Sequence, residues 1–251
     1  MKISAVIITY NEEVNIKRCL ESLQGIADEI IVVDSFSTDK TEEICKQFDT
    51  RFISHEFEGH KEQKNWAWQQ ARFDYVLSLD ADEALDADLK NSILQVKMNP
   101  SFSTYKMNRL TNYCGTWIRH GSWYPDTKLR LAKKNSVIWA GENPHDKLTP
   151  LNNEKPVHLK GNILHYSYYT IAQHIAQQEK FSTIASQAMF ERGKKAPLYK
   201  LVLNPVASVI KDIIIRQGFL DGKSGFTVAK ISAKSVYWKY RKLRDLWDEE
   251  S

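Results

Sequence analysis

Three carboxylates cluster at the end of one apolar run of the sequence. The run reads FDYVLSLDADEALDADL, residues 73–89, and it places Asp80, Asp82 and Glu83 within four positions of one another. Carboxylates this close repel each other unless a cation lies among them. The spacing therefore favours a hard divalent cation, Mg²⁺ or Mn²⁺, whose remaining ligands are the oxygens of a diphosphate.

Other chemistries of acidic or phosphate-binding motifs do not fit this segment. An EF-hand loop requires Gly and Glu at its sixth and twelfth positions, where this chain has Leu85 and Asn91. A phosphatase with an aspartate nucleophile usually has Thr or Val where Ala84 stands, and its motif usually follows the first strand. A glycine-rich dinucleotide turn and a Walker A motif are both absent. The alternative to a cation site is a solvated acidic turn.

The elements before this motif alternate between apolar strand-forming runs and helical periodicity. Such alternation predicts an α/β fold with a mostly parallel, doubly wound sheet. Strands are expected at 3–10, 29–35, 50–55 and 74–80, and helices at 11–25, 37–48 and 59–72. Because ligands bind beyond the carboxyl ends of parallel strands, the polar residues that end all four strands are expected to meet at one edge.

The pattern changes after residue 100. Short runs rich in aromatic residues, at 103–121, 127–141 and 161–168, predict antiparallel strands. From Thr170 onward the periodicity is helical, with helices expected within 170–193, 196–220 and 227–247. We therefore predict two domains, residues 1–169 and a helical extension over residues 170–251.

Charge is unevenly distributed along the 251 residues. The net charge is +4, yet residues 191–244 hold 13 Lys or Arg against three acidic residues, a surplus of +10 that leaves −6 for the rest. A basic end favours a phosphate-rich partner, either an anionic membrane surface or a nucleic acid. Three widely spaced cysteines indicate neither a disulfide framework nor a zinc site, and they favour the reducing cytoplasm. The N-terminus is too short in apolar residues for a signal peptide.

Four segments in this order resemble family 2 glycosyltransferases of the GT-A fold: AVIITYNEE, IIVVDSFSTDKT, GHKEQKNWAW and YVLSLDADE. The later segments HGSWYPDTKLRL, ENPHDKL, LHYSY and GFLDG are similar to a narrower group, the lipopolysaccharide inner-core glucosyltransferases of the WaaE/KdtX type. The resemblance covers nearly the whole chain. It implies a GT-A domain with antiparallel strands on the acceptor side, a nucleotide-sugar donor, a divalent metal ion and inversion at the transferred sugar.

The resemblance also implies roles for individual residues. Asp34 is expected to accept a hydrogen bond from the base, with helix capping as its alternative, and Asp82 is expected to ligate the metal together with His145. Asp80 is expected to touch the ribose or the metal, whereas Glu83 is expected to shape the turn. The other expected donor-binding residues are Thr9, Tyr10, Glu12, Lys61, Lys64, Asn65 and Ala81.

An inverting transferase needs a general base for the acceptor hydroxyl. The candidates are Asp126, Glu142 and Asp146, and Asp146 is preferred although related sequences commonly have Glu there. Trp117, Trp123 and Tyr124 are candidates for stacking on sugar rings, with the apolar core as their alternative.

Apolar stretches interleaved with Lys and Arg in the C-terminal helices favour a segment that lies in a membrane interface rather than one that spans it. The expected function is transfer of a hexose, glucose from UDP-glucose, onto a lipid-linked saccharide such as the lipopolysaccharide inner core, at the cytoplasmic face of the bacterial inner membrane. The alternative acceptor is a capsule or polyprenyl-linked glycan. The alternative role of the C-terminal helices is a helical cap on the sheet. The alternative class of protein is a nucleic-acid-binding module, but no motif for it is present and no nucleic acid is expected.

Overall fold

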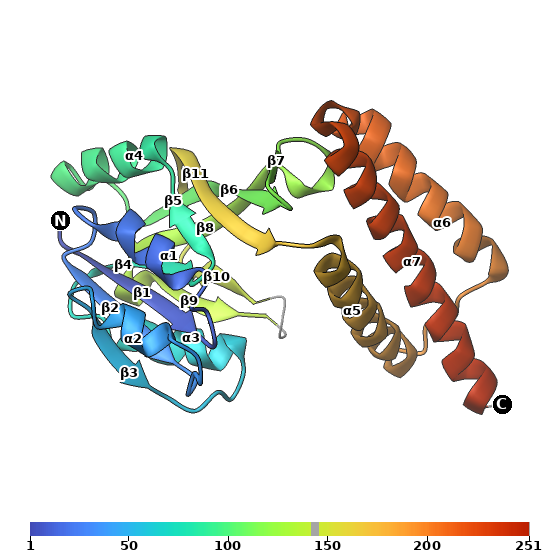
Figure 1. Ribbon diagram of the computed structural model, residues 1–251, viewed down its shortest axis with the longest axis horizontal. Helices are drawn as coiled ribbons and strands as arrows, with labels where there is room; N and C mark the ends of the chain where they lie inside the picture. Colours follow the sequence, from blue (N-terminus) through green and yellow to red (C-terminus); the bar gives the residue numbers. More distant parts are fainter. Residues whose placement is uncertain (142–145, 251) are drawn as a thin grey trace. The chain divides into compact units, whose positions relative to one another are not determined.

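The computed structural model describes residues 1–141 and 146–250. The chain forms two compact units (Figure 1): unit 1 comprises residues 1–109 and 126–166, and unit 2 comprises residues 110–125 and the chain from residue 167 onward. The predicted boundary at residue 170 stays a prediction. The structure adds that a segment from the middle of the chain, residues 110–125, belongs with the C-terminal helices.

The first half of unit 1 is the predicted parallel sheet. Its strands lie in the order β3-β2-β1-β4 and all pair in parallel. They are β1 (Ile3–Thr9), β2 (Glu29–Asp34), β3 (Arg51–Ser54) and β4 (Tyr75–Asp80). The strands form from near-continuous apolar runs because both faces of this part of the sheet are covered.

Helices connect these parallel strands, as the periodicity predicts. They are α1 (Ile16–Leu23), α2 (Thr41–Cys45) and α3 (His60–Gln69). Helix α1 starts five residues later than predicted and buries Ile16, Cys19, Leu20 and Leu23 in the largest apolar core. Helix α4 (Ala87–Met98), which the sequence analysis did not assign, starts after Asp86, whose carboxylate accepts a hydrogen bond from the Leu89 N–H.

Antiparallel strands extend the sheet beyond β4. The order continues β8-β6-β11-β5, with β8 (Asp126–Lys133), β6 (Thr104–Tyr113), β11 (Val157–Tyr168) and β5 (Glu83–Leu85). Strands β9 (Val137–Ala140) and β10 (Lys147–Pro150) form a separate two-stranded sheet. The predicted α/β class is therefore confirmed, with parallel strands first, antiparallel strands next and helices at the C-terminal end.

Unit 2 contains the ends of β6 and β11, the short strand β7 (Thr116–Ile118) and the helices α5 (Ile171–Glu191), α6 (Leu198–Ile210) and α7 (Gly222–Glu250). Helix α5 begins at a capping box made by Thr170 and Gln173. A π-helical turn, Lys211–Ile215, continues α6. Within the described residues, no helix combines the length and apolar character that crossing a bilayer would require.

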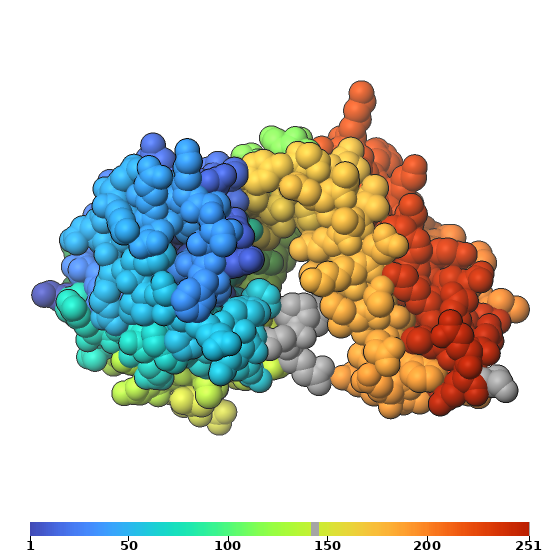
Figure 2. All heavy atoms as spheres, turned by 60° about the horizontal axis from the view of Figure 1, so that its bottom comes forward, coloured from blue at the N-terminus to red at the C-terminus, as the bar shows by residue number. Residues whose placement is uncertain are grey.

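The core of unit 2 is aromatic. Tyr113, Ile118, Tyr168 and Val228 pack together, and Trp123 stacks on Tyr168 with ring centroids 5.6 Å apart. Trp123 therefore packs against this core, which is the alternative to sugar stacking that the sequence left open for it. Helices α5 and α7, drawn in yellow-orange and red in Figure 2, lie side by side, and the Lys242 ammonium donates to the Glu179 carbonyl across them.

Candidate active site at the ends of the parallel strands

The polar strand ends of unit 1 meet at one edge of the sheet, as the fold class requires. Thr9 is paired with Asp34, Asp34 with Ser54, and Ile8 with Asp80. Residues that are far apart in the sequence are therefore neighbours in register at the carboxyl ends of β1, β2, β3 and β4. This is the edge where open α/β sheets bind ligands.

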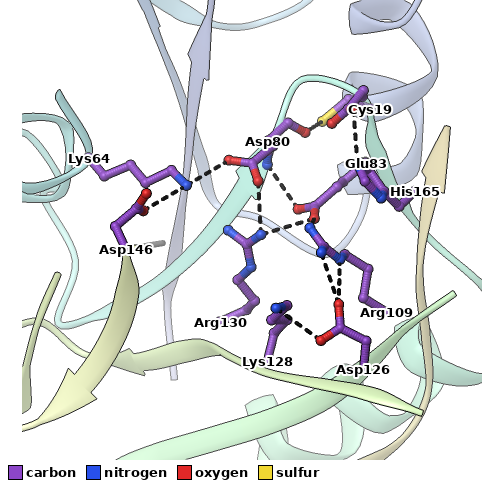
Figure 3. A network of polar contacts seen from close by, with 11 residues as sticks. Cys19, Lys64, Asp80, Glu83, Arg109, Asp126, Lys128, Arg130, Asp146 and His165 are labelled. Atoms are coloured by element: carbon purple, nitrogen blue, oxygen red, sulfur yellow. Dashed lines mark hydrogen bonds and ion pairs between the residues drawn. The ribbon is translucent and has the colours of Figure 1, made fainter. Parts of the chain in front are cut away.

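Asp80 lies at the centre of a network of ion pairs (Figure 3). Its carboxylate is 2.9 Å from Nη2 of Arg130 and 3.2 Å from Nζ of Lys64. Its backbone N–H donates to the Glu83 carboxylate at 3.0 Å. Side chains from β8 and α3 thus fix the Asp80 carboxylate at the end of β4.

Glu83 is a buried, ion-paired member of the same network. Only 1% of the residue is exposed, and its carboxylate is 2.9 Å from Nη2 of Arg130 and 3.5 Å from Nη1 of Arg109. Because two guanidiniums and a backbone N–H occupy it, Glu83 shapes the turn between β4 and β5, in line with the role expected for it.

The electrostatics of Asp80 and Arg130 hold both groups charged. Burial alone would raise the pKa of Asp80, but Lys64 and Arg130 outweigh burial and hold that pKa well below its usual range. Burial alone would lower the pKa of Arg130, but Glu83 and Asp80 raise it. The repulsion that the sequence predicted among these carboxylates is therefore relieved in part by cationic side chains of the protein itself.

Asp82 differs from its neighbours because it forms no ion pair with an arginine or lysine of the described residues. Its carboxylate is 3.1 Å from Nε2 of His165 on β11, and the two side chains are 24% and 14% exposed. The Asp82 carbonyl accepts from the Tyr166 N–H at 2.9 Å, which fixes β11 beside the motif. An accessible carboxylate next to an imidazole supplies two ligands of the kinds that divalent metals accept in proteins.

The described residues hold no group of three or more His, Cys, Asp or Glu side chains arranged for a metal ion. Asp82 and His165 would therefore need other ligands, such as phosphate oxygens and water, to complete a metal's coordination. His145, the second metal ligand expected from the sequence, lies outside the described residues, as does Glu142.

The two candidate bases that the structure describes belong to the same network. The Asp146 carboxylate lies 3.1 Å from Nζ of Lys64, so a single ammonium bridges Asp146 and Asp80. Asp126 pairs with Arg109 at 2.9 Å and with Lys128 at 2.9 Å. Burial would raise the pKa of Asp126, but Arg109 and Lys128 outweigh burial and lower it.

The expected nucleotide-binding residues line the ends of β1 and β2. Thr9 is buried, and its hydroxyl has no hydrogen-bond partner within the described part of the chain. Tyr10 is 59% exposed. Burial raises the pKa of Glu12, and the negative charges of Asp82, Asp39 and Asp80 raise it further.

Asp34 already carries local hydrogen bonds. Its carboxylate accepts from the Ser37 N–H at 2.8 Å and from the Ser37 hydroxyl at 2.5 Å, so it organises the turn after β2. An ionised carboxylate has further lone pairs for a second donor.

The three predicted donor-binding residues on α3 have different partners. Lys64 points into the network, whereas the Asn65 side chain exchanges hydrogen bonds with the backbone of Trp139 and joins α3 to β9. Lys61 pairs with Glu62 at 3.0 Å, and Ala81, in the turn between β4 and β5, is buried.

Sequence analysis missed Arg109, Arg130 and His165. Arg130 stands in the run LRLA, where a charged residue interrupts the buried part of a strand. His165 similarly stands within the strand LHYSY. A buried charge in a strand signals an ionic partner, but the sequence does not give the register that identifies it.

The chain is similar in sequence to glycosyltransferases of other bacteria. An uncharacterised glycosyltransferase of Rickettsia typhi is 31% identical over 98% of this chain and 87% of its own length. The lipopolysaccharide core biosynthesis glycosyltransferase LpsC of Rhizobium meliloti is 25% identical over 96% of this chain and 93% of its own length. Among solved structures, residues 1–349 of S. aureus TarS match with a TM-score of 0.47 and 16% identity, covering 96% of this chain and 92% of that one.

The family model described as "Glycosyl transferase family 2" matches residues 4–192, from the second residue of β1 to just beyond the end of α5. The match spans the strand ends, the acidic motif and the network built on Asp80. The chain belongs to glycosyl transferase family 2.

Proposed function

We propose that this protein transfers a hexose, glucose from UDP-glucose, onto a lipid-linked saccharide of the lipopolysaccharide inner core, with inversion at the sugar. The observation that carries the proposal is the different environment of the three carboxylates at the end of β4. Asp80 and Glu83 are locked by cationic side chains, whereas Asp82 is accessible beside His165. The relative LpsC supports the class of acceptor.

A divalent ion, Mg²⁺ or Mn²⁺, would be held by Asp82 and His165. Their separation of 3.1 Å and partial exposure fit a shared ion whose other ligands come from the donor. When bound, such an ion neutralises the negative charge that builds on a departing diphosphate.

The base is assigned to Asp146, which would take the proton of the acceptor hydroxyl as the hydroxyl attacks the sugar. Lys64 positions this carboxylate at 3.1 Å and fixes it relative to Asp80. Asp126 is the alternative candidate. Arg109 and Lys128 lower its pKa, and a carboxylate of lowered pKa is a poorer proton acceptor.

Access to a lipid-linked acceptor is assigned to an apolar face of unit 2. Helix α6 buries none of its residues, and its exposed large side chains recur at helical spacing: Leu198, Tyr199, Val202, Leu203, Val206, Val209 and Ile210. Between residues 192 and 220 six Lys or Arg accompany these side chains. The one acidic residue there, Asp212, is buried. An apolar helix face with cations and no exposed acid suits the surface of an anionic bilayer.

The basic residues of α7 are less suited to that contact, since several bind the protein itself. Lys242 donates to Glu179, Ser182 and Thr183, Arg244 donates to the Ala196 carbonyl, and Arg241 pairs with Asp245. Part of the positive charge of the C-terminal extension is therefore bound to other residues of the protein. Helix α6 is the better candidate for the element that faces the membrane.

The donor and metal assignment is tested by thermal shift and by transfer assays on Asp82→Asn. UDP-glucose with Mn²⁺ should raise the melting temperature of the parent protein, and Asp82→Asn should lose the metal-dependent part of that rise together with transfer. Asp88→Asn, an exposed carboxylate on α4, is the matched control and should behave like the parent. Transfer at the parent rate by Asp82→Asn would overturn the assignment.

A further inference from the structure

Unit 2 contains a cavity of about 520 Å³ with a cationic lining. Its polar lining residues are Arg119, His120, Ser122, Tyr124 and Arg216. They come from two segments that are far apart in the sequence, the loop after β7 and the turn after the π-helical segment. No role in the proposed reaction accounts for this cavity.

Asp221 fixes the first segment. Its Oδ2 accepts from the backbone N–H of Arg119 at 3.0 Å and from that of His120 at 2.8 Å. Its Oδ1 lies 2.9 Å from Nδ1 of His120, which sets the orientation of the ring. One buried carboxylate therefore determines the backbone and one side chain of the loop that lines the cavity.

Further contacts join the two segments directly. The Gly121 N–H donates to the Arg216 carbonyl at 2.9 Å, and the Ser122 hydroxyl donates to the Asp212 carboxylate. Within the second segment the backbone turns so tightly that a Cβ added at Gly218 would lie 2.7 Å from the Asp212 carbonyl oxygen, and the same Cβ would lie 3.6 Å from Gly121 Cα in the first segment. The cavity wall is thus held from both sides before any ligand binds.

The charges of this wall are unbalanced. Asp212 and Asp221 are buried and occupied by the hydrogen bonds that build the loop. The guanidiniums of Arg119 and Arg216 are exposed, and neither forms a hydrogen bond or ion pair with any residue in 1–141 or 146–250. Two exposed guanidiniums on a fixed scaffold suit an anion with several oxygens, because each guanidinium donates in a planar fork.

We propose that this cavity binds a phosphate monoester carried by a saccharide. A phosphate monoester brings about −1.5 to −2 charges and three acceptor oxygens at neutral pH, which match two guanidiniums. A volume of about 520 Å³ also leaves room for a sugar ring. The choice of a saccharide rests on the proposed function, whereas the choice of a phosphate rests on the two arginines alone.

The test is a calorimetric titration of the full chain, without donor or metal, against glucose 6-phosphate, inorganic phosphate and glucose. Glucose 6-phosphate should bind more tightly than inorganic phosphate, and glucose should not bind measurably. Arg119→Gln and Arg216→Gln should each weaken binding of glucose 6-phosphate about tenfold or more, the scale of losing charge-assisted hydrogen bonds. Arg241→Gln, an exposed arginine outside the cavity that pairs with Asp245, should leave binding unchanged.

A second arm separates a saccharide phosphate from a lipid headgroup. Vesicles of phosphatidic acid should compete poorly with glucose 6-phosphate for the cavity, and strong competition would overturn the saccharide assignment. Binding that is equal in the parent and in the Arg119→Gln, Arg216→Gln double variant would overturn the site itself. This titration needs neither donor nor metal, so its result does not depend on transfer. A protein that binds glucose 6-phosphate in the titration but transfers no hexose in the separate transfer assay would refute the proposed function and leave the cavity assignment intact.

Discussion

Replacing Arg130 by Met tests whether the network around Asp80 stabilises the fold. The Arg130 side chain is 4% exposed, and its Nη2 lies 2.9 Å from both Asp80 and Glu83. Methionine keeps most of the length and apolar volume but removes the charge. After the change, Glu83 retains its ion pair with Arg109 at 3.5 Å, and Asp80 retains its ion pair with Lys64 at 3.2 Å.

Removing one partner of a buried ion pair typically costs about 3–5 kcal/mol, because the other charge stays buried without compensation. Since Arg109 and Lys64 remain, we expect the lower end of this range, about 3 kcal/mol of unfolding free energy. Urea denaturation followed by circular dichroism measures this loss. The control is Arg72→Met, whose side chain is 69% exposed and pairs with Glu29, and which should cost less than about 1 kcal/mol.

A double variant identifies the source of the cost. If the cost comes from the stranded charge of Glu83, adding Glu83→Gln to Arg130→Met should destabilise less than the sum of the two single changes, with a coupling of about 1–3 kcal/mol. The reasoning is refuted if Arg130→Met costs no more than Arg72→Met, or if the two changes are additive.

Three further predictions concern the base, the pH dependence and the membrane. Asp146→Asn should lower turnover by about 10²- to 10⁴-fold in a transfer assay while UDP affinity, measured by titration, hardly changes. Burial lowers the pKa of His174 from 6.5 to about 4, so the folded state resists its protonation and unit 2 should lose up to about 3 kcal/mol of stability as the pH falls from 6.5 towards 4. Denaturation of His174→Gln at several pH values should show a smaller loss. Val202→Asp with Val206→Asp should release the protein from phosphatidylglycerol vesicles in a sedimentation assay.

Each of these predictions has a contrary outcome. A turnover loss with Asp126→Asn but not with Asp146→Asn would exchange the two candidate bases. A pH dependence in His174→Gln equal to that of the parent would remove the buried imidazole as its cause. Val14→Asp, which changes an exposed valine of unit 1, should leave vesicle binding unchanged, and equal release by both valine variants would rule out a specific role for α6.

The sequence predicted the strands of unit 1 and the edge where they end, because long apolar runs leave few alternatives for residues 3–9 or 75–80. It also placed Asp80 and Asp82 at that edge, because they directly follow the apolar run of β4 in the sequence. It did not predict which cations lie beside them. Arg130 follows Asp80 by 50 residues and pairs with it only because β8 lies beside β4, and sequence periodicity does not encode the choice of neighbouring strand.

The helices after Thr170 show the same limit. Helical periodicity predicted three helices after Thr170, and all three are present. The amphipathic pattern did not distinguish a face that packs on another helix from a face that stays exposed. Lys242 and Val202 illustrate this, because the lysine is bound across α5 and α7 whereas the valine is 63% exposed on α6.

The interleaved path of the chain has a consequence for how this protein can be cut or recombined. The backbone passes from one unit to the other after Arg109, after Pro125 and after Tyr166. A truncation after residue 169 would strip Tyr113 and Ile118 of the Val228 side chain that packs against them and of the rest of α5 to α7. One crossover in the gene therefore cannot add, remove or exchange unit 2 as a terminal module. The two units are expected to be inherited together.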